Sequence, residues 1–203
     1  MKFNILLLLL LAVVLGSASN AQEAGTGGLS GVEKESLRIY ENRGGDFELT
    51  GPDGKGISSE SFRGKVILIY FGYTYCPDVC PMSLSHLKVG MLELEEQAKE
   101  VQVLFVSIDP ERDTPEKLKE YVPYFHPDFI GLTGSVNDVA EVAKQYGSHY
   151  FKQYVESVEG YFMAHTDAVF LVDQEGRYRG RYKTEWDMEK LISNIQWLLN
   201  SGS

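Results

Sequence analysis

Hydrophobic positions along the chain fall into two kinds of pattern, continuous apolar runs and amphipathic repeats. Residues 65–71 form a continuous apolar, β-branched run, and residues 101–108 form a second, largely apolar one; both are typical of strands buried on both faces of a sheet. Between them, residues 83–99 place leucine and methionine at helical spacing among acids and lysines, which predicts an amphipathic helix. The first half of the chain therefore predicts two buried strands joined by a helix.

The second half of the chain continues this alternation in shorter elements. Pro115 predicts the first position of a helix, with Asp113 or Thr114 as its cap. Further helices are predicted over residues 135–146 and 187–199. In the first of these, the apolar positions expected to point inward are Val136, Val139, Val142 and Ala143. Strands are predicted over residues 129–132, 151–155, 168–172 and 177–182.

Taken together, these elements predict the class of fold. Strands that alternate with helices, followed by a hairpin and a terminal helix, indicate an α/β sandwich with a mixed central sheet. The alternation at residues 47–50 and the turn Gly51-Pro52-Asp53-Gly54 add a small N-terminal hairpin. The 203 residues suit one domain with a proper core, and the sequence shows neither a repeat nor a second domain.

The N-terminus has the pattern of a secretory signal. One lysine precedes the apolar run Ile5–Leu15, and small residues lead to an exit at Ala21. Eleven apolar residues are too few for a bilayer, which takes about 20. We expect a signal peptide over residues 1–21, with an uncleaved membrane anchor as the alternative, then a flexible lead-in over 22–40 and one domain over 41–203. The domain would be exported, either periplasmic or tethered to the membrane and facing the periplasm.

The charge balance excludes a nucleic-acid partner. Lysine and arginine total 19 against 29 aspartates and glutamates, which gives a net charge of −10. Binding to phosphate backbones is driven by clustered basic side chains, and the sequence shows no such cluster.

Cys76 and Cys80, the only cysteines, lie where a buried strand ends and a helix begins. A disulfide between them would close a very short loop and add little stability. The start of a helix lowers the pKa of a thiol and favours the thiolate, which attacks disulfides and binds metals. Three residues separate the pair, against two in thioredoxin-type motifs, and positions i and i+4 of a helical turn share one face. The pattern therefore favours redox or metal chemistry over two inert buried cysteines.

A third ligand is wanted if the pair binds metal, and His165 is the candidate. It lies directly before the strand at 168–172, and in a thioredoxin-like sheet the loop into that strand faces the cysteine turn. Thioredoxin-type enzymes carry a cis proline there, and this chain has none. The other histidines, His86, His126 and His149, are most simply solvated residues.

Three acids and a methionine near these motifs are weaker candidates. Asp109 and Asp113 are expected to serve a strand-end turn and a helix cap, with contact near the site as the alternative. Asp78, between the cysteines, is expected to be a solvated acid, although it could contact a partner or tune the ligands. Met82 could offer a thioether to Cu(I).

Three sequence blocks in this order and spacing resemble the Sco/SenC family over residues 47–199. The blocks are Cys76-Pro77-Asp78-Val79-Cys80-Pro81, then Ser107 to Pro115 (SIDPERDTP), then His165-Thr166-Asp167 ahead of Val169 to Asp173. The resemblance implies a thioredoxin fold in which Cys76, Cys80 and His165 hold copper, as Cu(I) or Cu(II). It also implies delivery of copper to, or thiol maintenance of, the CuA centre in subunit II of cytochrome c oxidase. Such a protein is expected to be a metallochaperone that assists assembly, and thiol:disulfide oxidoreductase activity stays open.

Two alternative functions use the same cysteines. In a thiol:disulfide oxidoreductase, Cys76 and Cys80 would be the catalytic pair, and His165 would not be needed. A copper or redox sensor that signals to a membrane partner would have a similar sequence. Copper binding needs the dithiol, whereas an exported compartment favours the disulfide, so a thiol reductant is expected as a second partner.

Overall fold

The computed structural model describes residues 37–154, 160–183 and 187–201. The predicted signal peptide and its cleavage site after Ala21 lie outside these residues. Within them, no helix is both long enough and apolar enough to cross a membrane. The chain packs against the domain from Leu37 onward, because Leu37 is buried and its carbonyl accepts a hydrogen bond from Arg179 Nε at 2.7 Å.

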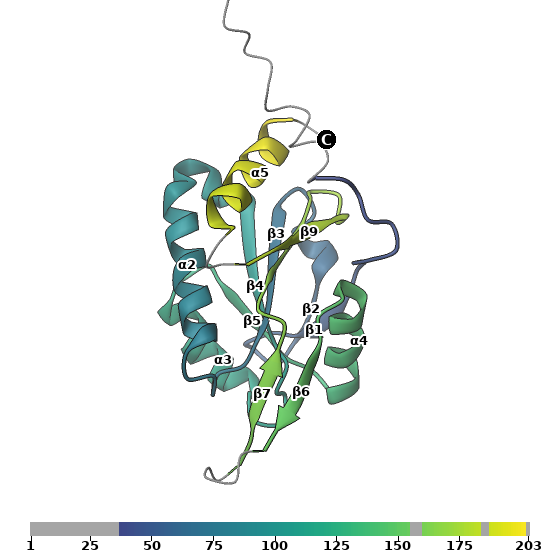
Figure 1. Ribbon diagram of the computed structural model, residues 1–203, viewed down its shortest axis with the longest axis vertical. Coiled ribbons are helices and arrows are strands. Elements are labelled where there is room, and N and C mark those ends of the chain that lie inside the picture. Colours follow the sequence, from purple (N-terminus) through teal and green to yellow (C-terminus); the bar gives the residue numbers. More distant parts are fainter. Residues whose placement is uncertain (1–36, 155–159, 184–186, 202–203) are drawn as a thin grey trace, which may run out of the picture.

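A five-stranded mixed sheet forms the centre of the structure (Figure 1). β3 pairs in parallel with β4, and β4 with β5, whereas β8 and β9 join on the other side as antiparallel strands. The mixed sheet predicted from the sequence is confirmed. In spatial order its strands are β5 (Ile130–Leu132), β4 (Val101–Ser107), β3 (Val66–Gly72), β8 (Val169–Val172) and β9 (Tyr178–Tyr182).

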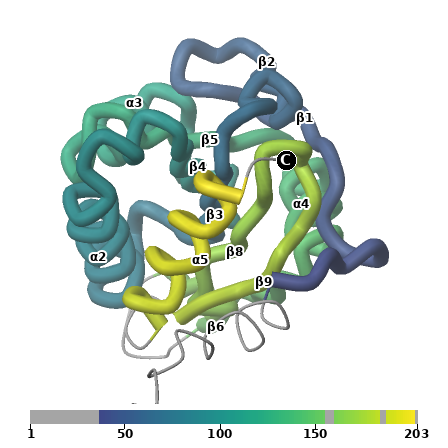
Figure 2. The backbone as a smooth tube through the Cα atoms, turned by 90° about the horizontal axis from the view of Figure 1, so that it is seen from above, coloured from purple at the N-terminus to yellow at the C-terminus, as the bar shows by residue number. Residues whose placement is uncertain are grey.

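Helices cover both faces of this sheet. Figure 2 shows α2 and α5 on one side and α4 on the other, with the strands between them. Every residue of β3 and β4 is buried, which explains why both were continuous apolar runs in the sequence. The helices are α2 (Val79–Glu93), α3 (Pro115–Tyr121), α4 (Val136–Tyr146) and α5 (Met188–Asn200), with short 3-10 helices η1 (Ser59–Phe62), η2 (Glu95–Glu100) and η3 (Val122–Tyr124).

Two small antiparallel pairs lie outside the main sheet. β1 (Glu48–Thr50) and β2 (Gly56–Ser58) form the predicted N-terminal hairpin. β6 (Tyr150–Gln153) pairs with β7 (Phe162–His165), and Figure 1 shows this pair projecting from one end of the domain. A strand was expected near β6, and His165 was expected in a loop, whereas His165 is the last residue of β7.

The boundaries of α2 differ from the prediction. The helix begins at Val79 and ends at Glu93, whereas residues 83–99 were predicted. Pro81 fits in the first turn, where backbone N–H groups need no helical partner. Glu95 has a φ of 51°, which stops the α-helix before the 3-10 helix η2 begins.

Val136 is a second correction, because it was expected to point inward. It is 53% exposed at the first position of α4. Ser135 caps this helix by accepting a hydrogen bond from the Asp138 N–H, and the Asp138 carboxylate accepts from the Ser135 N–H in return. The capping box, not apolar burial, defines this end of the helix.

The turn between β8 and β9 depends on a buried carboxylate. Asp173 Oδ2 accepts hydrogen bonds from Arg177 Nε and Arg179 Nη1, both at 2.8 Å. Burial alone would raise the pKa of Asp173, but hydrogen bonds from the Arg177 backbone and from both guanidiniums outweigh it and lower the pKa. Since Arg179 also reaches the Leu37 carbonyl, this cluster ties β9 to the entering chain.

Replacing Asp173 with alanine should therefore destabilise the fold. The change leaves the buried guanidinium of Arg179 without its anion, and we expect a loss of about 3 kcal/mol in the free energy of unfolding. Urea denaturation followed by circular dichroism measures this. Asp53→Ala is the matched control, because Asp53 pairs with Lys119 at an exposed position, and its unfolding curve should overlay that of the wild type. Equal curves for both variants would contradict the assignment.

Candidate metal centre

Cys76, Cys80 and His165 come together at one end of the sheet, although 85 positions separate Cys80 from the histidine. Their sulfur and nitrogen ligand atoms all lie within 4.8 Å of one another. The Cys80 Sγ and the His165 Nε2 are 3.4 Å apart, and the Cys80 N–H donates to the Cys76 Sγ, also over 3.4 Å. Both cysteines are free thiols.

The two cysteines occupy different positions relative to α2. Cys76 lies in the turn after β3, where its N–H donates to the Tyr73 carbonyl at 3.3 Å, and Cys80 lies in the first helical turn. The sulfurs face each other across a helix start, and not from two turns of one helix. Cys76 is half-buried, whereas Cys80 has an exposed fraction of 0%. A reagent or partner from solvent therefore meets Cys76 first.

Gly72, the last residue of β3, leaves room for the buried sulfur. A Cβ atom at this position would lie 3.0 Å from the Cys80 Sγ and 2.8 Å from the Phe105 ring. A side chain here would push the strand and the cysteine apart, since protein interiors leave few gaps that can absorb an added methyl group.

The environment of the pair separates the acidities of its two thiols. A hydrogen bond from the Cys80 thiol lowers the pKa of Cys76 to about 3, against the penalty of partial burial, and the Cys80 backbone N–H adds to the effect. The same hydrogen bond and deeper burial raise the pKa of Cys80. The pair is thus poised as a thiolate at Cys76 beside a protonated thiol at Cys80.

His165 is held with one ring nitrogen directed at the sulfurs. Its Nδ1 lies 3.2 Å from the Thr166 carbonyl oxygen, which can only accept, so Nδ1 carries the proton in this hydrogen bond. Nε2 is left with its lone pair facing the Cys80 Sγ, which is the arrangement a metal-binding imidazole needs. The rings of Tyr70 and Tyr73 pack edge-on against the imidazole, with centroids 6.2 and 6.0 Å away.

The Asp167 carboxylate forms hydrogen bonds close to the three candidate ligands. Asp167 Oδ1 accepts from the Tyr70 hydroxyl at 3.2 Å and from the Ser83 hydroxyl at 3.1 Å. Burial, together with the nearby Cys80, raises the pKa of Tyr70, which keeps it a hydrogen-bond donor. Because Tyr70 belongs to β3, Ser83 to α2 and Asp167 to the segment after β7, this contact joins the three elements that carry the candidate ligands.

Asp113 fixes the loop that leads to Cys76. It has an exposed fraction of 0%, and its carboxylate accepts from the Thr74 N–H at 2.9 Å, the Thr74 hydroxyl at 2.5 Å and the Ser107 hydroxyl at 2.7 Å. The helix cap itself is Thr114. Asp113 was expected to serve a helix cap or turn, with contact near the site as the alternative, and its bonds to Thr74 bear out the alternative.

Asp109 and Arg112 fix the hairpin that carries His165. Asp109 accepts from the Tyr161 hydroxyl at 2.8 Å and pairs with Arg112 Nε at 2.5 Å. Arg112 also donates to the Tyr161 carbonyl at 3.0 Å, and its guanidinium lies 3.8 Å from the centre of the Tyr161 ring. Since Tyr161 directly precedes β7, the segment from Ser107 to Asp113 holds both halves of the site. Two sequence signals pointed to this segment: its polar residues lie close together after a buried strand, and it forms the second block of the Sco/SenC resemblance.

The remaining candidates lie apart from the three ligand atoms. His126 accepts a hydrogen bond from the Asp128 N–H and stacks on the Phe129 ring. His149 is exposed. His86 lies on α2, partly buried, and is not in the group. Asp78 is exposed between the cysteines, as expected for a solvated acid, and Met82 is 38% exposed on α2.

Comparison with protein families matches residues 36–200 to the family described as SCO1/SenC. A mitochondrial SCO2 protein of Saccharomyces cerevisiae is 39% identical over 172 residues, which cover 81% of this chain and 57% of the yeast protein. The chain therefore spans little more than half the length of that relative. A SCO2-like protein of Rickettsia prowazekii is 36% identical over 161 residues, covering 77% of this chain and 78% of that protein.

Solved structures agree with this similarity. Bradyrhizobium japonicum ScoI, solved with copper bound, superposes with a TM-score of 0.70 at 36% identity, covering 77% of this chain and 99% of that one. Yeast Sco1 with copper bound gives 0.70 at 32% identity, over 80% and 91% of the two chains. The apo Sco1 protein of Thermus thermophilus gives 0.70 at 38% identity, over 81% and 96%. These superpositions confirm the predicted thioredoxin-like fold.

Asp113→Asn should loosen the cysteine loop without removing a candidate ligand. The amide cannot accept with the strength of a carboxylate and brings N–H groups into a space already filled with donors. We expect hydrogen exchange at the Thr74 amide to become at least about tenfold faster, since a hydrogen bond to a charged group is worth about 1.5–3 kcal/mol. Asp78→Asn, which changes an exposed acid in the same loop, should leave this rate unchanged. Equal exchange in wild type and Asp113→Asn would refute the positioning role.

Proposed function

This chain belongs to the SCO1/SenC family, and from that premise we propose that it is a copper metallochaperone. Cys76, Cys80 and His165 would hold the copper, which is cargo to be passed on. The proposal includes an exported domain, over residues 41–203, that is either periplasmic or tethered to the membrane by its N-terminal segment. Its partner would be subunit II of cytochrome c oxidase, in which it would assist assembly of the CuA centre.

One observation carries this proposal, namely two sulfurs and one imidazole nitrogen within 4.8 Å. Thiolate sulfur and imidazole nitrogen are ligands that copper favours, and Cu(I) is stable with three of them. The relatives from Bradyrhizobium japonicum and yeast were solved with copper bound, which supports copper over zinc for the same donor set. The hydrogen bond that fixes the proton on His165 Nδ1 leaves Nε2 ready to coordinate.

The unequal burial of the cysteines supports transfer as well as binding. Cys76 is half-buried and Cys80 is fully buried, so a thiol of a partner protein would approach the metal from the Cys76 side. Copper can bind only when both cysteines are reduced. A thiol reductant in the same compartment is therefore part of the proposal.

His165→Ala tests the ligand set. The variant keeps both sulfurs but lacks the nitrogen, and we expect copper affinity to fall by about 100-fold, because losing one ligand costs a few kcal/mol. The reduced protein would be loaded with Cu(II), and bound copper and thiolate-to-copper charge-transfer absorption would be measured. The absorption band should shift or vanish in the variant.

The matched control is His149→Ala, which removes an exposed histidine outside the group. It should bind copper as the wild type does, with the same absorption band. A Cys76→Ser, Cys80→Ser double variant should bind no copper at the site. An unchanged spectrum in His165→Ala would remove that residue from the ligand set, and tight binding by the double variant would overturn the proposal.

Thiol–disulfide exchange is the second candidate function, favoured by the low pKa of Cys76 beside the protonated thiol of Cys80. The Cys76 thiolate would attack a substrate disulfide, form a mixed disulfide and release one substrate thiolate. The Cys80 thiol would then lose its proton to that thiolate or to solvent and attack the Cys76 sulfur. This would release the second substrate sulfur and leave a Cys76–Cys80 disulfide, and the thiol reductant would restore the dithiol.

Catalytic reduction of a generic disulfide distinguishes the two functions. A metallochaperone should reduce insulin disulfides no faster than free dithiothreitol does. A separate measurement tests the unequal acidity of the two thiols: iodoacetamide at pH 6 should alkylate Cys76 in strong preference to the buried Cys80. Rapid turnover that survives His165→Ala, combined with weak copper binding, would favour the oxidoreductase. Mass spectrometry of the alkylated peptides, with urea-unfolded protein as the control, reports the preference.

A further inference from the structure

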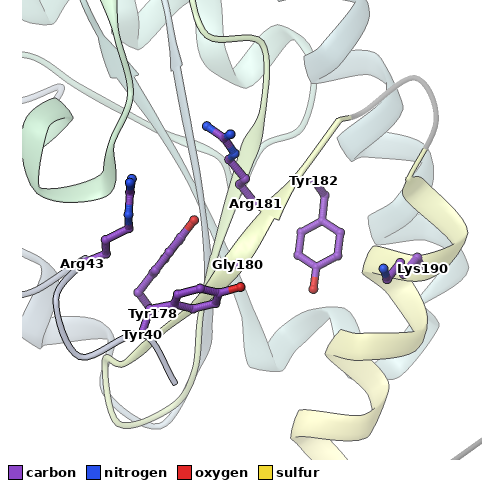
Figure 3. A pocket seen from close by; sticks show the side chains of 7 residues that line it. All are labelled: Tyr40, Arg43, Tyr178, Gly180, Arg181, Tyr182 and Lys190. Carbon is purple, nitrogen blue, oxygen red and sulfur yellow. The ribbon is translucent and has the colours of Figure 1, made fainter. Parts of the chain in front are cut away.

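A pocket on the β9 edge of the sheet, with a volume of about 370 Å³, gathers cations in an otherwise acidic protein. Figure 3 shows the side chains that line it. They come from the segment that enters the domain, from β9 and from α5, and they are Tyr40, Arg43, Tyr178, Gly180, Arg181, Tyr182 and Lys190. We propose that this pocket binds a phosphate ester, an anion with a phosphate group and a small organic substituent.

Among the residues that the structure describes, the three cations have no anionic partner of their own. None of the ion pairs formed among the described residues includes Arg43, Arg181 or Lys190, although the chain carries 29 acids. No carboxylate is among the seven residues lining the pocket. Asp167 and Asp187 line a neighbouring hollow that shares Arg181 and Tyr182. The pocket itself is lined by three positive charges and no carboxylate, and this excess of positive charge favours an anion.

Arg43 is held in place by the end of a neighbouring helix. Gly147 ends α4 in the left-handed conformation, with φ at 71°, and a Cβ there would lie 1.7 Å from Arg43 Nη1. The Arg43 guanidinium therefore lies against the backbone of Gly147, at the negative end of the α4 dipole. The helix end thus favours this position of the guanidinium, although Arg43 is itself an exposed residue.

Tyrosine hydroxyls supply further donors beside the cations. The Tyr178 hydroxyl has no hydrogen-bond partner among the described residues, and the Tyr182 hydroxyl already accepts from Asn194 at 2.7 Å, so its own proton is free to donate. Burial raises the pKa of Tyr178 to about 12, and the positive charges of Arg181 and Arg43 act against this rise. The hydroxyls stay protonated at neutral pH and can donate to an anion.

The donors favour phosphate over other anions. Planar guanidiniums pair bidentately with phosphate or carboxylate, and the added phenol and ammonium donors match an anion with three or four oxygens better than one with two. The pocket is also larger than a lone phosphate ion needs, and its tyrosine rings offer apolar surface for a substituent. A phospholipid headgroup and a soluble phosphate ester share this chemistry.

The pocket is separate from the metal centre. β9 is the edge strand, and β8 lies between it and β3, which leads to Cys76. None of the pocket residues touches the cysteines or His165 through a hydrogen bond or ring contact of the described structure. Copper binding and anion binding can therefore be measured independently.

The test is titration of the full chain with glycerol 3-phosphate, followed by amide chemical shifts. We expect shifts centred on residues 40–43 and 178–182. In an Arg43→Gln, Arg181→Gln, Lys190→Gln variant the affinity should fall at least about tenfold, since charge-assisted hydrogen bonds are lost. A second arm uses vesicles of phosphatidylglycerol and phosphatidylcholine against phosphatidylcholine alone. Variant-sensitive binding to the anionic vesicles identifies a lipid source, and binding of glycerol 3-phosphate alone identifies a soluble one.

The matched control is Lys55→Gln, Lys88→Gln, Lys99→Gln, which removes the same charge at exposed positions on other elements. It should bind glycerol 3-phosphate as the wild type does, and both triple variants should load copper normally, which shows that they are folded. The single variant Arg181→Lys should lose part of the affinity, because it keeps the charge but not the planar fork. Absence of shifts at the pocket, equal losses in both triple variants, or shifts with polyglutamate but not with phosphate would each overturn the proposal.

Discussion

The parallel register of β3 and β4 fixes the geometry on which the metal centre depends. Gly72 lies opposite Ser107 at the ends of the two strands, and the Ile108 N–H donates to the Gly72 carbonyl at 2.8 Å. The loop to Cys76 and the loop to Asp113 therefore leave the sheet side by side. A buried carboxylate is costly unless it is fully hydrogen-bonded, and Asp113 satisfies this requirement only through the Thr74 backbone and hydroxyl and Ser107. The cysteine loop thus has one arrangement that leaves no buried charge unpaired.

The same constraint extends to the histidine through the β6–β7 pair. Tyr161 begins the segment that leads to His165, and it is held from two sides, by the Asp109 carboxylate at its hydroxyl and by Arg112 at its carbonyl. The ligands come from three separate parts of the chain, but their supports come from one short segment after β4. This explains how a site with a half-exposed sulfur can still be well ordered. Buried polar contacts of the supporting residues hold the ligands rigidly, while Cys76 stays accessible from solvent.

The sequence was most informative where burial alone decides the structure. The runs at residues 65–71 and 101–108 correctly predicted strands covered on both faces, and the spacing of the cysteines after a strand indicated reactive sulfur. Contacts between distant segments were harder to predict. β7 is four residues long and is a strand only because it pairs with β6, and Val136 looked like a core position in a helical repeat although it is the exposed first residue of α4. Asp113 stands where helix caps usually stand, so only the fold could reveal that its carboxylate holds Thr74.

The basic side chains near the metal centre and those at the β9 edge of the sheet differ in their partners. Near the metal centre, Arg112 lies over the Tyr161 ring and pairs with Asp109, and Lys117 Nζ lies 3.4 Å from the centre of the Tyr75 ring. These cations are already stabilised by aromatic faces or carboxylates, and they shape the rim of the site. At the β9 edge, Arg181 and Lys190 have neither kind of partner among the described residues, although tyrosines surround them. An acidic chain that neutralises its basic groups in one place and leaves them unpaired in another has a physical reason to attract an anion at the second.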